Sequence, residues 1–407
     1  MTIKSTRNLL AAALLSACAT VAILSTPASA ATLNEVVQRH LAAAQTAANA
    51  KDFTKAQAEV DAARGASGRT PYDDLMINKF AIPVAASANN MELAATAAQN
   101  VADSSALDPK ELPGALNIAI QLSLATKAND KAIAYAKKLE ALKPADPQLI
   151  GMVANAYYVG GDYAGAKAFA NAQIAAAKAA GKRVDKNLML VLMSANVSLK
   201  DENGAEQALE EIVAAYNDPA DWAQLIDVAI TSEGIRDVEA IWLGRLLFLV
   251  GAPVSKQDAD MIGSIAGHLT FFGDAVNAKA KGGTVDPDPT PRADADKKTI
   301  QEQIGQIPSQ NGVYAAKLAE ALYSYGMYAE AEAAAKVAVT KGGNPDTTEA
   351  PMVLGQALAA QGKYAEVKAS FATITSGGGP ATPRIVRLWT YFVNGKLNPP
   401  AQAAAAK

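Results

Sequence analysis

The chain is written as stretches of apolar residues with a helical period, separated by short polar interruptions. Alanine dominates the apolar positions, and it is the best helix former and allows helices to pack closely. The interruptions carry glycine, asparagine or Asp-Pro, which are signals that end one helix and start the next. The pattern predicts an all-α protein built from antiparallel helix pairs.

A six-residue phrase recurs at three of these interruptions, at residues 161–166, 326–331 and 362–367. Each copy opens with a glycine, which reaches the left-handed conformation that ends a helix. A tyrosine follows two residues later, and a small residue three further on lets the two backbones approach. We therefore expect corresponding structural positions for Tyr163, Ala166, Tyr328, Ala331 and Tyr364.

Asp-Pro pairs and one polar segment divide the chain further. Proline suits the first turn of a helix, so Asp108, Asp146 and Asp218 are expected to precede helices. The segment 282–296 is rich in Asp and Pro and is expected to be a non-helical linker or exposed loop. This predicts a helical repeat array over residues 31–281, a second array with a capping helix over 297–396, and a disordered tail over 397–407.

Residues 1–30 have the features of an export signal: Lys4 and Arg7, then an apolar run, then small residues at 28–30. The interpretation is a periplasmic protein. An alternative remains open, because the residues before Cys18 resemble a lipobox, which would make the chain an outer-membrane lipoprotein involved in envelope assembly.

Composition limits the chemistry. The net charge is −3 over 407 residues, without a basic stripe, which argues against nucleic acid as a partner. The most apolar later segment, 240–250, is interrupted by Gly244 and Arg245, so it is expected to be a buried helix and not a membrane span.

Residues for known catalytic motifs are scarce. The chain has one cysteine and two histidines, too few for a usual zinc site. His268 is expected in the core and His40 on the surface, and there is no nucleophile elbow or phosphate loop. We expect no catalytic residues, no metal and no cofactor, and a helical enzyme with unrecognised acidic residues is the less favoured alternative.

The recurring phrase and the 34-residue interval from Ala132 to Ala166 resemble the tetratricopeptide repeat family. The residues that match its pattern are Tyr157, Gly161, Tyr163, Ala166, Leu318, Gly326, Tyr328, Ala331, Leu354, Gly355, Gly362, Tyr364 and Phe371. The resemblance implies an α-solenoid, a right-handed superhelix of helix pairs that binds proteins or peptides on its concave face.

Candidate contact residues follow from that resemblance. A polar residue recurs at one first-helix position, and tyrosines lie nearby; the set is Gln121, Asn155, Tyr158, Glu320, Tyr323 and Gln356. The family's carboxylate clamp fails on this chain, because Gly151 and Met352 stand where basic side chains are needed. The alternatives are a solvated face and tyrosines used for repeat packing. The expected function is an exported, non-catalytic scaffold that binds a protein or peptide, with the oligomeric state open.

Overall fold

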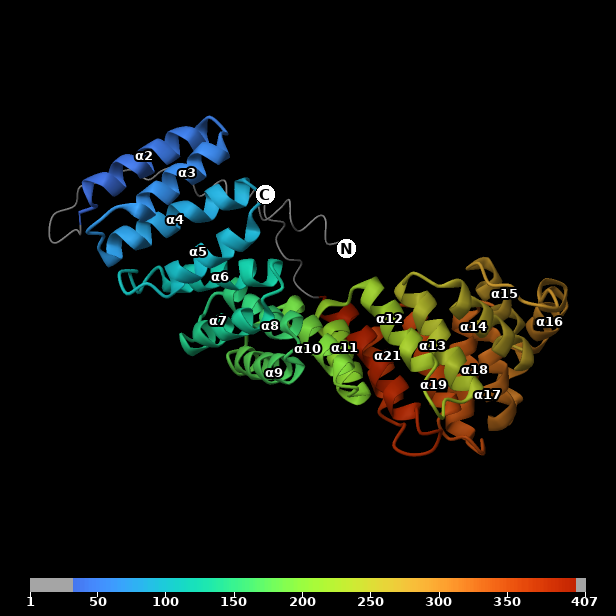
Figure 1. The fold of residues 1–407 in the computed structure, drawn as a ribbon. Helices are drawn as coiled ribbons and strands as arrows, with labels where there is room; N and C mark the ends of the chain where they lie inside the picture. Colours follow the sequence, from blue (N-terminus) through green and yellow to red (C-terminus); the bar gives the residue numbers. More distant parts are fainter. Residues whose placement is uncertain (1–31, 400–407) are drawn as a thin grey trace. The chain divides into compact units, whose positions relative to one another are not determined.

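The computed structural model describes residues 32–399 and separates into two compact units, one ending at Glu202 and the other beginning at Asn203 (Figure 1). Within the described range the regular elements are helices, without a strand. Residues 1–31, which include the segment expected to be an export signal and Cys18, and residues 400–407 lie outside the described residues. The division differs from the boundary expected at 282–296, which falls inside the second unit.

Unit 1 is a succession of helix pairs. Its helices are α2 (Glu35–Asn49), α3 (Phe53–Gly65), α4 (Pro71–Ser87), α5 (Met91–Ala102), α6 (Leu112–Ala125), α7 (Asn129–Ala141), α8 (Pro147–Gly160), α9 (Tyr163–Ala179) and α10 (Lys186–Ser198). Consecutive helices pack on one another, and first helices of neighbouring pairs also touch, α2 with α4, α6 with α8 and α8 with α10. The all-α fold of consecutive helix hairpins is thus confirmed, with a solenoid-like arrangement.

One turn geometry joins the two helices of each pair. Gly161 has a positive φ of 93°, and the next N–H, of Asp162, donates to the carbonyl of Tyr157 at 2.9 Å. Lys51 and Lys127 hold φ values of 60° and 59° at the same place, with the same backbone bond five residues back. Glycine is therefore one of several residues used for this turn.

The small residue of the recurring phrase lies in the interior throughout. Ala166 and Ala331 are fully buried, and so are Ala56, Ala94 and Ala132 at the same distance from their own turns. A methyl group there lets the helices of a pair approach closely, as expected from the sequence.

Unit 2 continues the hairpins. Its helices are α11 (Glu202–Tyr216), α12 (Pro219–Ile230), α13 (Asp237–Val250), α14 (Lys256–His268), α15 (Phe272–Ala280), α16 (Thr290–Gln303), α17 (Gly312–Ser324), α18 (Tyr328–Lys341), α19 (Glu349–Ala360), α20 (Tyr364–Phe371) and α21 (Thr382–Leu397), with a 3-10 turn at Ile304–Ser309. Gly326 and Gly362 take positive φ at their turns, and so does Thr270 between α14 and α15.

Part of the segment expected to be a linker is helical. α16 begins at Thr290, whose N–H donates to the Asp288 carboxylate at 3.0 Å. Pro291 lies in the first turn, where proline is tolerated. Asp288 also pairs with Lys279 at 2.7 Å. The expectation of a non-helical segment up to residue 296 was wrong, because Asp288 and Pro291 act here as helix-start signals.

The apolar segment 240–250 forms α13, which is buried from Glu239 to Leu247. α13 packs on α12, α14 and α21 (Figure 1), so it lies inside unit 2 as expected. α21 covers α20, with Trp389 against Phe371 and Phe392 against Tyr364. In residues 32–399 no helix combines the length and apolar character needed to cross a membrane.

Candidate functional site

The expected contact residues share a register. Gln121, Asn155, Glu320 and Gln356 each lie six positions before the left-handed residue of their hairpin turn, and Ser194 of α10 lies at the same distance from Lys200. We call these five residues the polar row. Tyr158 and Tyr323 lie three positions before the turn residue, so the two tyrosines also correspond to each other. The distance from the turn therefore identifies one equivalent polar position on each of these first helices.

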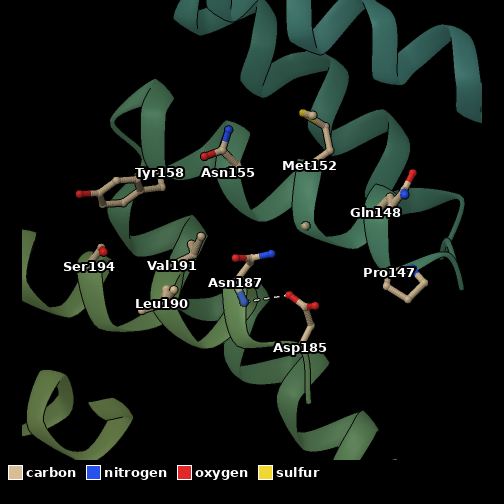
Figure 2. A pocket seen from close by; sticks show the side chains of 11 residues that line it. Pro147, Gln148, Met152, Asn155, Tyr158, Asp185, Asn187, Leu190, Val191 and Ser194 are labelled. Carbon is tan, nitrogen blue, oxygen red and sulfur yellow. Dashed lines mark hydrogen bonds between the residues drawn. The ribbon is translucent and has the colours of Figure 1, made fainter. Parts of the chain in front are cut away.

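In unit 1, Asn155 and Ser194 of the polar row border a pocket of about 600 Å³ between α8 and α10. The residues that line it are Pro147, Gln148, Gly151, Met152, Asn155, Tyr158, Asp185, Asn187, Leu190, Val191 and Ser194. Figure 2 shows Asn155 and Tyr158 on α8, and Ser194 and Val191 on the neighbouring α10. Two neighbouring first helices thus supply equivalent faces of one cavity.

Both polar atoms without a hydrogen-bond partner among the described residues and apolar side chains line this pocket. No hydrogen bond joins the side chain of Asn155, or the hydroxyl of Tyr158, to another residue in the described range. Met152, Leu190 and Val191 add apolar surface between them. The pocket can therefore accept a group that is apolar along its stem and polar at its tip.

Asp185 is the one carboxylate among the residues that line the pocket, and none of them is Lys, Arg or His. One of its oxygens accepts the N–H groups of Asn187 and Leu188, at 2.9 and 3.2 Å, and so caps α10. The pocket is negative or neutral, a poor receptor for a carboxylate. Gln121 lies outside it, and its amide donates to Asn117 of α6 at 3.1 Å.

In unit 2, the same positions are buried and occupied by this chain. Glu320 and Gln356 are fully buried, and Tyr323 is 6% exposed. Arg245 of α13 donates to Glu320, and to Gln356 Oε1 at 3.0 Å. Its guanidinium carbon lies 4.4 Å from the Tyr323 ring centroid. The structure therefore places these three candidate contact residues in the interior, against α13.

The role of Arg245 in filling this position was not expected, because the sequence marks it only as an interruption of an apolar run. Its side chain also donates two hydrogen bonds to Asp274 Oδ2, at 3.0 and 2.7 Å. Burial lowers the pKa of the Arg245 guanidinium, but the Asp274 and Glu320 carboxylates raise it more, so the group stays charged. Burial raises the pKa of Glu320, against the effect of Arg245.

Two of the three repeat tyrosines have equivalent ring partners. Tyr163 packs on Tyr158 and Tyr328 packs on Tyr323, in each case five residues apart. Tyr364 packs instead on Phe392 of α21, because Ala359 holds the corresponding earlier position. Gly355 faces the ring of Phe371, where a Cβ would come within 2.2 Å of Cε1.

The two histidines lie apart from the pocket between α8 and α10. His40 Nδ1 lies 2.8 Å from Glu59, and His268 is exposed, so its expected core position was wrong. Among the described residues, no three His, Cys, Asp or Glu side chains lie together as a metal ion requires.

A second cavity, of about 580 Å³, lies beside the start of α17. Its lysines are engaged already: Lys341 donates to the carbonyls of Pro308 and Gln310, and Lys317 to Glu349.

Neither a known protein-family model nor a curated protein sequence matches the chain. What the geometry establishes is an all-helical protein packed as sequential hairpins, with an open polar row in unit 1 and a filled one in unit 2.

Proposed function

We propose that the chain is an exported, non-catalytic scaffold of the tetratricopeptide type that binds a protein or peptide through unit 1. The single observation that carries this proposal is the pocket between α8 and α10, in which Asn155 and Tyr158 keep unpartnered polar atoms. Polar groups that converge beside apolar surface in a concave site are typical of binding sites.

The lining favours a polypeptide partner. Side-chain amides both donate and accept, so Asn155, Gln148 and Asn187 suit the N–H and C=O groups of a peptide. Met152 and Val191 supply adaptable apolar surface for a side chain. Export is proposed from residues 1–30 alone, and the lipoprotein alternative through Cys18 is separated from it by the mass of the mature protein.

Site-specific photocrosslinking tests the proposal. The crosslinking residue p-benzoylphenylalanine replaces Met152 in the pocket, and Ala168 on the exposed face of α9 in a matched control. Discrete protein adducts are expected from position 152 in cells, and none of the same mass from position 168. Asn155→Leu introduced with the crosslinker at 152 should weaken the adducts.

The proposal is overturned if position 152 yields no adduct, or the same adducts as position 168. Adducts that Asn155→Leu leaves at full strength would also contradict it, because the polar row would then play no part in binding.

A further inference from the structure

Unit 2 shows what the polar row can hold. Between α17 and α19, consecutive first helices, Glu320 and Gln356 accept hydrogen bonds from one guanidinium. Between α8 and α10, also consecutive first helices, the corresponding residues are Asn155 and Ser194, and a pocket lies there. We propose that this pocket receives an arginine side chain presented by a helix of the partner, an inference that rests on the proposed function.

The tyrosine pairs support this assignment quantitatively. In unit 2, the rings of Tyr323 and Tyr328 lie 5.1 Å apart at 57°. In unit 1, those of Tyr158 and Tyr163 lie 5.5 Å apart at 54°. The guanidinium of Arg245 lies over the first ring of the unit 2 pair. The same platform is thus built in unit 1, with Tyr158 lining the pocket.

The hydrogen-bond acceptors also correspond. Asn155 Oδ1 and the Ser194 hydroxyl can accept from a guanidinium as Glu320 and Gln356 do. Neutral acceptors replace a carboxylate, so the contact is weaker than the buried ion pair of unit 2. That difference suits a partner that binds and leaves, while Arg245 is a permanent part of the fold.

The charge of the pocket favours a cation over an anion. Asp185 is its one carboxylate, and its lining has no basic side chain. A guanidinium is planar, stacks on an aromatic face and is more weakly hydrated than an ammonium, so arginine is favoured over lysine here.

We infer a helical ligand because Arg245, which fills the equivalent position in unit 2, is carried by the helix α13. Trp242 and Arg245 lie three positions apart on one helix face, and both side chains reach Glu320, with Trp242 Nε1 donating at 3.1 Å. On a partner helix, an aromatic residue three positions before the arginine would bring its ring to the apolar part of the pocket, at Met152 and Val191.

The test uses a stapled helical peptide of 16 residues with tryptophan and arginine three positions apart and a fluorescent label at one end. A control peptide carries citrulline, which keeps the shape of arginine and lacks its charge. Binding to the full chain is followed by fluorescence anisotropy. We expect the citrulline peptide to bind at least tenfold more weakly.

Protein variants locate the effect. Tyr158→Leu should abolish the preference for arginine over citrulline, while Tyr158→Phe, which keeps the ring, should retain it. Asn155→Leu should weaken binding of the arginine peptide at least fivefold. Far-UV circular dichroism that matches the unaltered chain shows that each variant is folded.

The inference is overturned if the arginine and citrulline peptides bind equally, if Tyr158→Leu leaves the preference intact, or if an unstapled peptide that stays extended binds as tightly as the helix. If position 152 gives adducts but the two peptides bind equally, the inference about arginine is contradicted and the proposed function is not. No adducts and no peptide binding would end the proposed function as well.

Discussion

The guanidinium carbon of Arg245 lies 4.4 Å from the ring centroid of Tyr323, in the interior of unit 2. Asp274 and Glu320 hold the same guanidinium by ion pairs, and Arg245 is only 3% exposed. The cluster joins α13 to α15, α17 and α19. Each member depends on the others, because an unpaired charge in this interior would lose its hydration without compensation.

Arg245→Met removes the cation and leaves the Asp274 and Glu320 carboxylates buried without it. We expect unit 2 to lose about 3–5 kcal/mol of its free energy of unfolding. The three tryptophans of the chain, Trp222, Trp242 and Trp389, all lie in unit 2. Denaturation followed by tryptophan fluorescence therefore reports this unit selectively.

An exposed ion pair in the same unit is the control. Lys256 and Asp260 pair at 2.7 Å with side chains 65% and 37% exposed, so Lys256→Met should change the free energy of unfolding by less than about 1 kcal/mol. Equal effects of the two substitutions would show that the buried cluster contributes no more than a surface pair.

Thr270→Gly should stabilise unit 2. Thr270 holds a φ of 61° at the turn between α14 and α15. A β-branched residue is strained there, because its Cβ approaches the backbone carbonyl. We expect a gain of about 1 kcal/mol in the free energy of unfolding, measured by tryptophan fluorescence.

The converse substitution at an equivalent turn is Gly326→Ala. Gly326 has a φ of 73°, and a Cβ added there would meet no atom within 4 Å. Only the strained backbone conformation opposes alanine here, so we expect the free energy of unfolding to fall by about 1 kcal/mol. Changes of the same sign at positions 270 and 326 would contradict the common turn geometry.

The turns show how far the sequence predicts this fold. Glycine at a helix end indicates a left-handed conformation, so the helix pairs that turn at Gly161, Gly326 and Gly362 could be identified directly from the sequence. Lys127 and Thr270 take the same conformation without a local signal, since packing of the two helices imposes it. Asn89 also marked its turn, because asparagine tolerates this conformation, and the aromatic and small residues that follow Lys51 marked another. The remaining pairs were recognisable by helical period alone.

The sequence predicts which positions of the repeats correspond to one another, but not which of them are exposed. Asn155 and Gln356 follow from counting back from a turn. Asn155 lines an open pocket, whereas Gln356 is buried, because Arg245 of α13 donates a hydrogen bond to Gln356 from 111 residues away in the sequence. Such a long-range contact follows from the packing of unit 2, and local patterns carry no information about it.

Gly355→Ala should destabilise unit 2. A Cβ at position 355 would lie 2.2 Å from Phe371 Cε1, and the Phe371 ring, which is buried, also packs against Trp389. The ring has little freedom to move, so overpacking of about 1–3 kcal/mol is expected. Thermal denaturation followed by tryptophan fluorescence measures it.

Gly267→Ala is the matched control for Gly355→Ala. Gly267 lies in α14, and a Cβ there would meet no atom within 4 Å. Alanine should stabilise this helix by about 0.5–1 kcal/mol, because it reduces the entropy lost on folding. A melting temperature that falls equally in both variants would show that the contact with Phe371 is not the cause.

Glu332 should give unit 2 an acid-sensitive component of stability. Burial by itself raises the pKa of Glu332, but hydrogen bonds from Lys336, Lys363 and Gln361 lower it more, from 4.5 to about 2. Lys363 and Gln361 lie at the next hairpin turn, at 2.7 and 2.8 Å, so the carboxylate ties α18 to the following pair.

The lowered pKa of Glu332 determines how the stability of unit 2 changes with pH. As the pH falls below about 5, the unfolded chain takes up a proton at Glu332 before the folded chain does, so folding becomes less favourable. The contribution is fully present above pH 5 and is lost as the pH falls toward 2. Because Lys336 and Lys363 are partly exposed and screened, we expect about 1–2 kcal/mol.

Glu332→Gln should therefore be less stable than the unaltered chain at pH 7, with a difference that shrinks steadily between pH 5 and pH 2. Glu302→Gln, at an exposed carboxylate of α16 for which the described range shows no ion pair, is the control and should show no such trend. Urea denaturation followed by tryptophan fluorescence at several pH values measures both. A difference for Glu332→Gln that stays constant with pH would mean that the lost contacts, and not the charge of the carboxylate, account for its effect.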